Sequence, residues 1–155
     1  MNLYQVIKVV HILSATIVFG TGLGIAFFMF RSYFTNNIHE KYYAVRNTVF
    51  GDYLFILPSV FMQPLTGVWL ISKSAQDWHA YWLILTYTLF AIAGLCWLPV
   101  VWIQIQLKNM LANSRQHNTP LPENYYLYFY RWILLGVPAF ISLVVIYFLM
   151  VIKPA

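Results

Sequence analysis

The sequence predicts an all-α integral membrane protein, a four-helix bundle whose consecutive helices run up and down. Of its 155 residues, 61% are hydrophobic and only 8% are charged, about a third of the roughly 25% found in soluble domains. Uncharged residues gather in four runs, each at least the ~20 residues that a helix needs to cross the hydrocarbon core. These runs are 9–30, 53–72, 78–107 and 132–152. Four crossings leave only short connections, so 1–155 is expected to be a single transmembrane domain.

The charges beside the spans predict their orientation. We place the spans at about 4–31, 46–72, 79–108 and 126–152. The connections after the first and third spans, with their edges, hold six Lys and Arg residues, and the opposite side holds three. Cytoplasmic loops carry the excess of positive residues, so both termini are expected on the outer side. The net charge of +5 therefore indicates contact with lipid head groups of the bilayer and no nucleic-acid partner.

The first span contains a histidine. His11 lies about eight residues inside the outer end, or ~12 Å at 1.5 Å per residue. An ionisable side chain at that depth indicates a functional site. A neutral imidazole can bind haem iron, and a four-helix bundle can hold a haem between its helices. The alternative is a structural histidine bonded to a polar side chain of another helix. Gly20 and Gly24 form a small-xxx-small pair, which predicts close helix packing.

The second span places four small or polar residues on one predicted helical face. They are Asp52, Ser59, Gln63 and Gly67. Gln63 lies about nine residues from the outer end, close to the depth of His11. Gln63 is therefore the natural partner of a structural His11, and it is equally placed to contact a cofactor bound there.

The third span begins with a second histidine, His79, on the same side of the membrane as His11. It is a candidate second axial ligand of a haem, although it lies shallower than His11. The alternative is an interfacial histidine in an aromatic belt with Trp78 and Trp82. Lys73, just before this span, is expected to meet the haem propionates. Trp97, on the same face of the span, is a further candidate cofactor contact.

The fourth span completes a polar cluster at the inner boundary. Asp52, Gln104 and Arg131 are expected to face inward at similar depth. An Asp52–Arg131 pair would neutralise two charges that are costly in hydrocarbon. Such a pair either holds the bundle together or takes part in a proton path, and we expect the structural role.

Three strings resemble an uncharacterised family of bacterial integral membrane proteins, catalogued as domain of unknown function 2269. They are KVVHILSA at 8–15, QPLTG at 63–67 and GLCWLP at 94–99, with Gln104 following. The resemblance covers nearly the whole chain, and its motifs fall in three different spans. It implies four helices in the bacterial inner (cytoplasmic) membrane and implies no activity.

A more distant similarity is to the HemJ-type protoporphyrinogen oxidases and the copper-resistance D-type membrane proteins. The first span shares their Lys-x-x-His pattern, here Lys8 and His11. That likeness implies haem b held by transmembrane histidines, with His11 matching the first-span histidine. Trp78-His79-Ala80 loosely resembles the Trp-x-His-x-Lys stretch of the HemJ type, but its lysine is absent here, where Tyr81 follows.

These observations favour a b-type haem protein with a redox or electron-transfer role. Its expected partners are a membrane redox protein or a quinone, and a homo-oligomer is expected. The alternative is a non-catalytic scaffold or accessory subunit of a larger complex, and a HemJ-like oxidase is the second alternative. A permease ranks last, because no span carries a dense lane of Met or carboxylate side chains. Whether the chain is an enzyme stays open.

Overall fold

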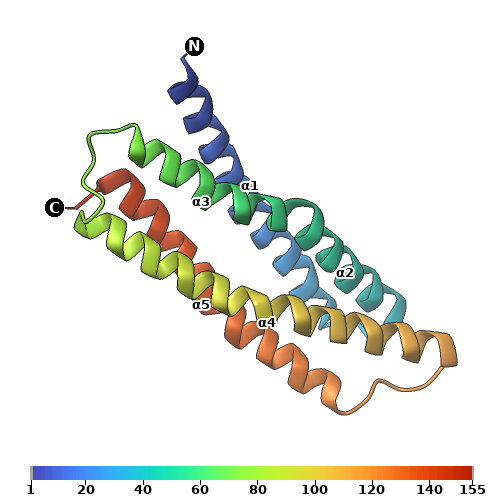
Figure 1. Cartoon of the computed structure of the whole chain (residues 1–155). Helices are drawn as coiled ribbons and strands as arrows, with labels where there is room; N and C mark the ends of the chain where they lie inside the picture. Colours follow the sequence, from blue (N-terminus) through green and yellow to red (C-terminus); the bar gives the residue numbers. More distant parts are fainter. Residues whose placement is uncertain (1, 155) are drawn as a thin grey trace.

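The computed structural model describes residues 2–154, which form long helices and no strand. The elements are α1 (Leu3–Ser32), α2 (Ile38–Gly51), η1 (Asp52–Ile56), α3 (Leu57–Ser72), α4 (Tyr81–His117) and α5 (Asn124–Ile152) (Figure 1). α2, η1 and α3 form one continuous rod, and the four resulting rods are all long and apolar enough to cross a membrane. The prediction of an all-α protein with four spans is confirmed. Which side of the membrane each terminus faces stays a prediction.

α4 continues well past the end predicted at 108. It runs to His117 and ends at Asn118, whose left-handed φ of 51° stops the helix. The prediction that 109–117 is part of a loop is therefore wrong. Leu107 and Leu111 are fully buried in the hydrophobic core. This packing extends the helix through polar residues that alone favour a turn.

α2 begins at Ile38, eight residues before the predicted start of its span at 46. The side chain of Asn37 caps it by accepting the backbone N–H of His39. Lys41, only 4% exposed, donates from Nζ to the carbonyl oxygens of Ser32 and Tyr33 at 3.1 and 2.9 Å. This ammonium group satisfies carbonyls at the C-terminus of α1 and complements its dipole. It thereby ties the first turn of α2 to the end of α1.

A π-helical segment, η1, lies inside the second rod. The N–H of Leu57 bonds to the carbonyl of Asp52, a spacing of five residues instead of the four of an α-helix. One extra residue turns the following helix by about 100° relative to an uninterrupted one. The prediction that Asp52 and Gln63 share one face is wrong for this reason: Asp52 contacts α4, whereas Gln63 contacts α1.

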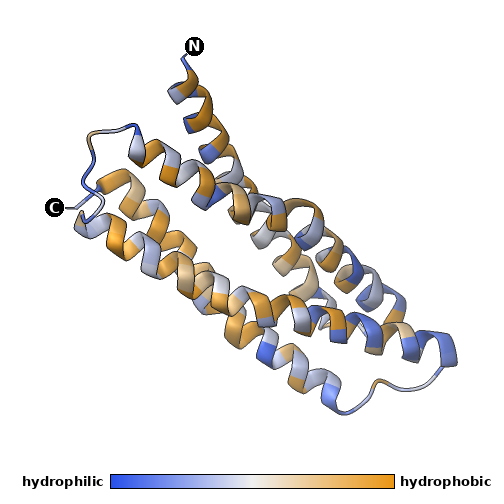
Figure 2. Ribbon diagram, in the orientation of Figure 1, coloured by the Kyte–Doolittle hydropathy of each residue, from blue (hydrophilic) through white to orange (hydrophobic). Residues whose placement is uncertain are grey.

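The larger buried core lies at the end of the bundle where α1 ends and α5 begins. It contains Met29, Val45, Val100, Ile103, Leu107, Leu111, Tyr125, Phe129 and Trp132. A smaller cluster of Trp82, Leu83 and Leu149 closes the opposite end of α4 and α5. Figure 2 shows apolar residues along all the rods and hydrophilic ones gathered where α2, α4 and the connection to α5 meet. Large apolar side chains such as Phe28, Leu95 and Val151 are exposed, as lipid-facing residues are.

Gly20 and Gly24 do not bring two helices together in this chain. A Cβ built on either glycine would have no atom within 4 Å. The predicted close approach at this pair is therefore wrong within the chain. Instead α1 contacts α5 through the side chain of Phe19. The centroid of its ring lies 5.2 Å from that of Phe140 and 5.4 Å from that of Tyr147. These bulky rings hold the two helices apart beside Gly20.

Candidate functional site

α1 crosses α3 (Figure 1), and the ring of His11 on α1 bonds to Thr66 on α3. The Nδ1 atom lies 2.7 Å from Oγ1 of Thr66. The Thr66 hydroxyl in turn donates to the carbonyl oxygen of Met62, one turn earlier in α3. The contact between His11 and α3 is thus one link in a chain of two hydrogen bonds.

That chain favours one tautomer of His11. A threonine hydroxyl has one proton, and when the Met62 carbonyl accepts it, the hydroxyl oxygen accepts from Nδ1–H of His11. We assign the proton to Nδ1 on this hydrogen-bond pattern. In the neutral ring, Nε2 then carries a lone pair, and no hydrogen-bond partner for it occurs among residues 2–154. This arrangement, with one nitrogen oriented and the other unoccupied, is how metal-ligating histidines are held.

Gln63 contacts the backbone of His11 and not its ring. Its Nε2 donates to the carbonyl oxygen of His11 at 2.8 Å and also to the hydroxyl of Ser14. The expectation that Gln63 would be the ring's partner is wrong, because the ring bonds Thr66 instead. The sequence held a signal for this: Thr66 lies in the same QPLTG string, three residues after Gln63 and so on the same helical face.

Gly67 leaves room for the His11 ring. A Cβ at position 67 would lie 3.4 Å from Cε1 of His11, so the ring packs directly against α3 at Gly67. Gln63, Thr66 and Gly67 therefore act together on one side of α3. The strings 8–15 and 63–67 meet face to face, although 52 residues separate Gln63 from His11.

His79 lies in the connection before α4 and not inside the bundle. Its side chain is 89% exposed and its Nδ1 lies 3.6 Å from Oδ1 of Asp77. This placement fits the interfacial alternative and leaves His79 away from the interior position that a second haem ligand needs. Lys73, the residue that ends α3, is also exposed near this connection. Among residues 2–154 no group of three or more His, Cys, Asp or Glu side chains could hold a metal ion.

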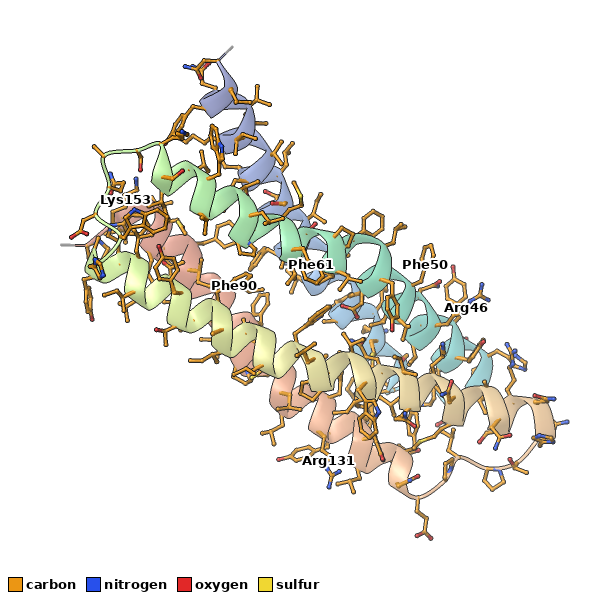
Figure 3. The ribbon with its side chains drawn as sticks, viewed as in Figure 1. Arg46, Phe50, Phe61, Phe90, Arg131 and Lys153 are labelled. Carbon is orange, nitrogen blue, oxygen red and sulfur yellow. The ribbon has the colours of Figure 1, made fainter. Side chains whose placement is uncertain are left out.

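The predicted inner cluster forms without Arg131. The Nε1 of Trp97 donates to Oδ1 of Asp52 at 3.1 Å, and Gln104 on the same helix faces the Asp52 carboxyl. Trp97 therefore belongs to this cluster, and its predicted role as a cofactor contact beside His11 is not supported. Arg131 is exposed and points away from the bundle (Figure 3). The predicted Asp52–Arg131 pair is wrong, because Phe129 and Trp132 take the inward face of α5.

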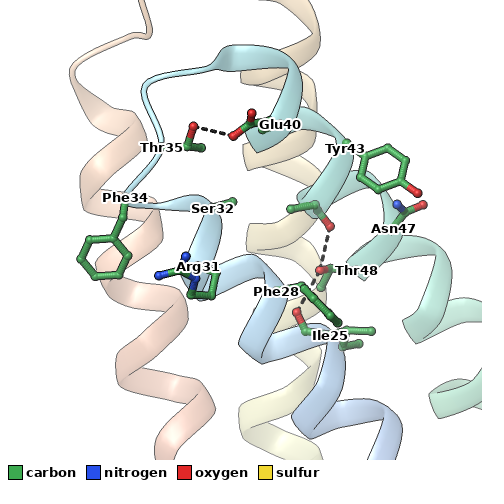
Figure 4. A pocket seen from close by; sticks show the side chains of 11 residues that line it. Ile25, Phe28, Arg31, Ser32, Phe34, Thr35, Glu40, Tyr43, Asn47 and Thr48 are labelled. Carbon is green, nitrogen blue, oxygen red and sulfur yellow. Dashed lines mark hydrogen bonds between the residues drawn. The ribbon is translucent and has the colours of Figure 1, made fainter.

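No sequence pattern predicted the cavity shown in Figure 4. It measures about 620 Å³ and lies between the end of α1 and α2, with Arg31, Glu40 and Asn47 on its polar side (Figure 4). A smaller cavity of about 280 Å³ lies between α1 and α5 beside Phe19 and Gly20. His11 lines neither of them, so its unoccupied nitrogen does not open into either cavity.

Comparisons with known proteins place the chain in one family. The model of the family described as "Predicted integral membrane protein (DUF2269)" matches residues 5–154. This match confirms the resemblance carried by the three sequence strings. No curated protein and no solved structure matched. The more distant similarity to the HemJ-type and copper-resistance D-type proteins is not shown.

Proposed function

The chain belongs to the DUF2269 family of predicted integral membrane proteins, and we propose that it binds b-type haem in the bacterial inner membrane. In this proposal His11 would bind the haem iron through Nε2. The bound haem would supply one-electron transfer, with a membrane redox protein or a quinone as the electron partner.

The single observation that supports this proposal is the tautomer of His11. Axial histidines bind iron through one nitrogen while the other donates to an acceptor that fixes the ring plane. Thr66 is such an acceptor for Nδ1, and its own proton is committed to Met62. Nε2 of the half-buried ring has no hydrogen-bond partner among residues 2–154, so it is free to bind a ligand atom.

The remaining residues of the site hold His11 in place. Gln63 bonds the His11 carbonyl and the Ser14 hydroxyl, so it fixes the register of α1 against α3. Gly67 keeps the space that the ring occupies. Lys73 is the proposed partner for a haem propionate at the outer end of α3. Because His79 is exposed beside Asp77, it would not bind the same haem iron as His11.

The test is an absorption spectrum of protein purified in detergent after expression with ample haem. We expect a Soret band in the native protein, its loss in His11→Ala and its retention in His79→Ala. Each variant is compared with the native protein by gel filtration and thermal unfolding, so that a lost band is not mistaken for a lost fold. Folded native protein without the band, or a band that survives His11→Ala, would contradict the proposal.

The second candidate function is a non-catalytic scaffold or accessory subunit. The hydrogen bonds that favour it are those of Gln63 to the His11 backbone and to Ser14, since they join α1 to α3 without involving the ring. This function predicts that His11→Ala lowers thermal stability while no cofactor is lost. The absorption spectrum and the unfolding temperature of the same variant therefore separate the two candidates.

A further inference from the structure

Asp52 is a carboxyl group buried within a membrane span, and it has no cation beside it. It is 4% exposed and begins the π-helical segment η1. Among residues 2–154 the one ion pair joins His79 to Asp77, near the outer end, so no Lys or Arg nitrogen lies within 4 Å of Asp52. An ionised carboxylate without a counter-ion is costly in a membrane interior.

The partners of Asp52 satisfy only half of its carboxyl group. Oδ1 accepts the indole N–H of Trp97. Oδ2 is buried and has no hydrogen-bond partner. Gln104 lies two helical turns beyond Trp97 on α4, is 3% exposed and faces the same carboxyl. Its Oε1 is also buried without a partner. Two buried acceptor oxygens, Oδ2 of Asp52 and Oε1 of Gln104, therefore lack a hydrogen-bond donor.

Two orphaned acceptors are satisfied by one added donor. We propose that Asp52 is a proton-binding site, with a proton on Oδ2. The side-chain amide of Gln104, whose oxygen and nitrogen exchange places by a flip, then turns Oε1 toward that proton and accepts its hydrogen bond. The carboxylic acid is then neutral, Oδ1 keeps its bond to Trp97 as a carbonyl oxygen, and both orphans gain a partner. A metal cation would need more oxygen ligands than these two atoms provide.

The surrounding backbone also favours a ligand-binding role over simple packing. π-helical segments of a single turn occur frequently at functional sites, and η1 is what turns Asp52 toward α4 while Gln63 and Thr66 face α1. This inference is independent of the proposed haem site, because the two clusters share no residue. Failure of the haem proposal would leave the Asp52 proposal standing, and the reverse also holds.

Infrared spectroscopy of the purified protein tests the proposal directly. A protonated carboxylic acid has a carbonyl stretch separate from the amide and carboxylate bands. The chain has four Asp and Glu residues, and the other three, Glu40, Asp77 and Glu123, are exposed. In a detergent without ester groups, we expect one carboxylic acid band in the native protein at neutral pH, with a shift to lower frequency in D₂O.

Variants assign that band to Asp52. Asp52→Asn should remove it and keep the fold, since the amide N–H can replace the acid O–H as the donor to Gln104. Asp77→Asn is the matched control and should leave the band unchanged. Trp97→Phe removes the donor to Oδ1, so the band should move to higher frequency. Native protein without the band, or a band that survives Asp52→Asn, would overturn the proposal; the first of these results needs no variant to fold.

Discussion

At the scale of single residues, the position of one proton decides what His11 can bind. The depth of His11 in the first span was predictable from sequence, because an uncharged run makes its only ionisable residue conspicuous. Its hydrogen-bond partner was predicted wrongly as Gln63, since Gln63 and Thr66 both lie on the face of α3 that contacts α1. Only the side-chain geometry shows that Thr66 bonds the ring of His11 while Gln63 bonds its backbone carbonyl.

The Thr66 hydroxyl is expected to strengthen haem binding through His11. Thr66→Val removes the acceptor of Nδ1, and loss of such an orienting partner typically costs about 10–100-fold in metal affinity. Titration of the apoprotein with haem, followed by absorbance, measures this loss. Thr66→Ser keeps the hydroxyl and should bind nearly as the native protein does.

Thr88→Val is the matched control for that substitution. The Thr88 hydroxyl bonds only to the carbonyl of Ile84 within α4 and is exposed, so its removal should leave haem affinity unchanged. Equal affinities for Thr66→Val and the native protein would show that Thr66 does not orient the ligand.

At the scale of elements, the four rods followed from the uncharged runs, whereas their ends and the π-helical segment did not. Helix ends depend on tertiary contacts here. The burial of Leu111 stabilises α4 beyond residue 108, and the hydrogen bond from Lys41 to the Ser32 carbonyl holds the first turn of α2 against the end of α1. The extra residue of η1 cannot be recognised from amino-acid composition, yet because of it Asp52 and Gln63 contact different helices. The inner cluster was therefore predicted in part, with Gln104 correct and Arg131 wrong.

Lys41 is expected to stabilise the junction of α1 and α2. Lys41→Met keeps much of the apolar stem but leaves the carbonyls of Ser32 and Tyr33 without their donor. An unsatisfied buried polar group costs about 1–3 kcal/mol, so the free energy of unfolding should fall by about that amount in denaturant titrations. Lys73→Met, at an exposed position, should change it little. Equal effects of the two substitutions would contradict this role.

At the scale of the whole molecule, the two polar sites lie on different helix pairs. The His11 site joins α1 to α3, and the Asp52 site joins η1 to α4. Both lie in rods made mostly of apolar residues (Figure 2). The charges that remain are concentrated at the ends of the rods, and their asymmetry alone predicts how the molecule sits in the membrane.

That asymmetry predicts that the connection 73–80 faces outward and the connection 118–123 faces the cytoplasm, because cytoplasmic loops carry the excess of Lys and Arg. Single cysteines test this in a Cys96→Ala background, since Cys96 is the only cysteine of the chain. Gln76→Cys and Thr119→Cys occupy exposed positions in the two connections. A membrane-impermeant maleimide added to intact spheroplasts should label Gln76→Cys and spare Thr119→Cys until the membrane is opened. The reverse pattern would place both termini in the cytoplasm, and the charge count would then have failed to predict the orientation.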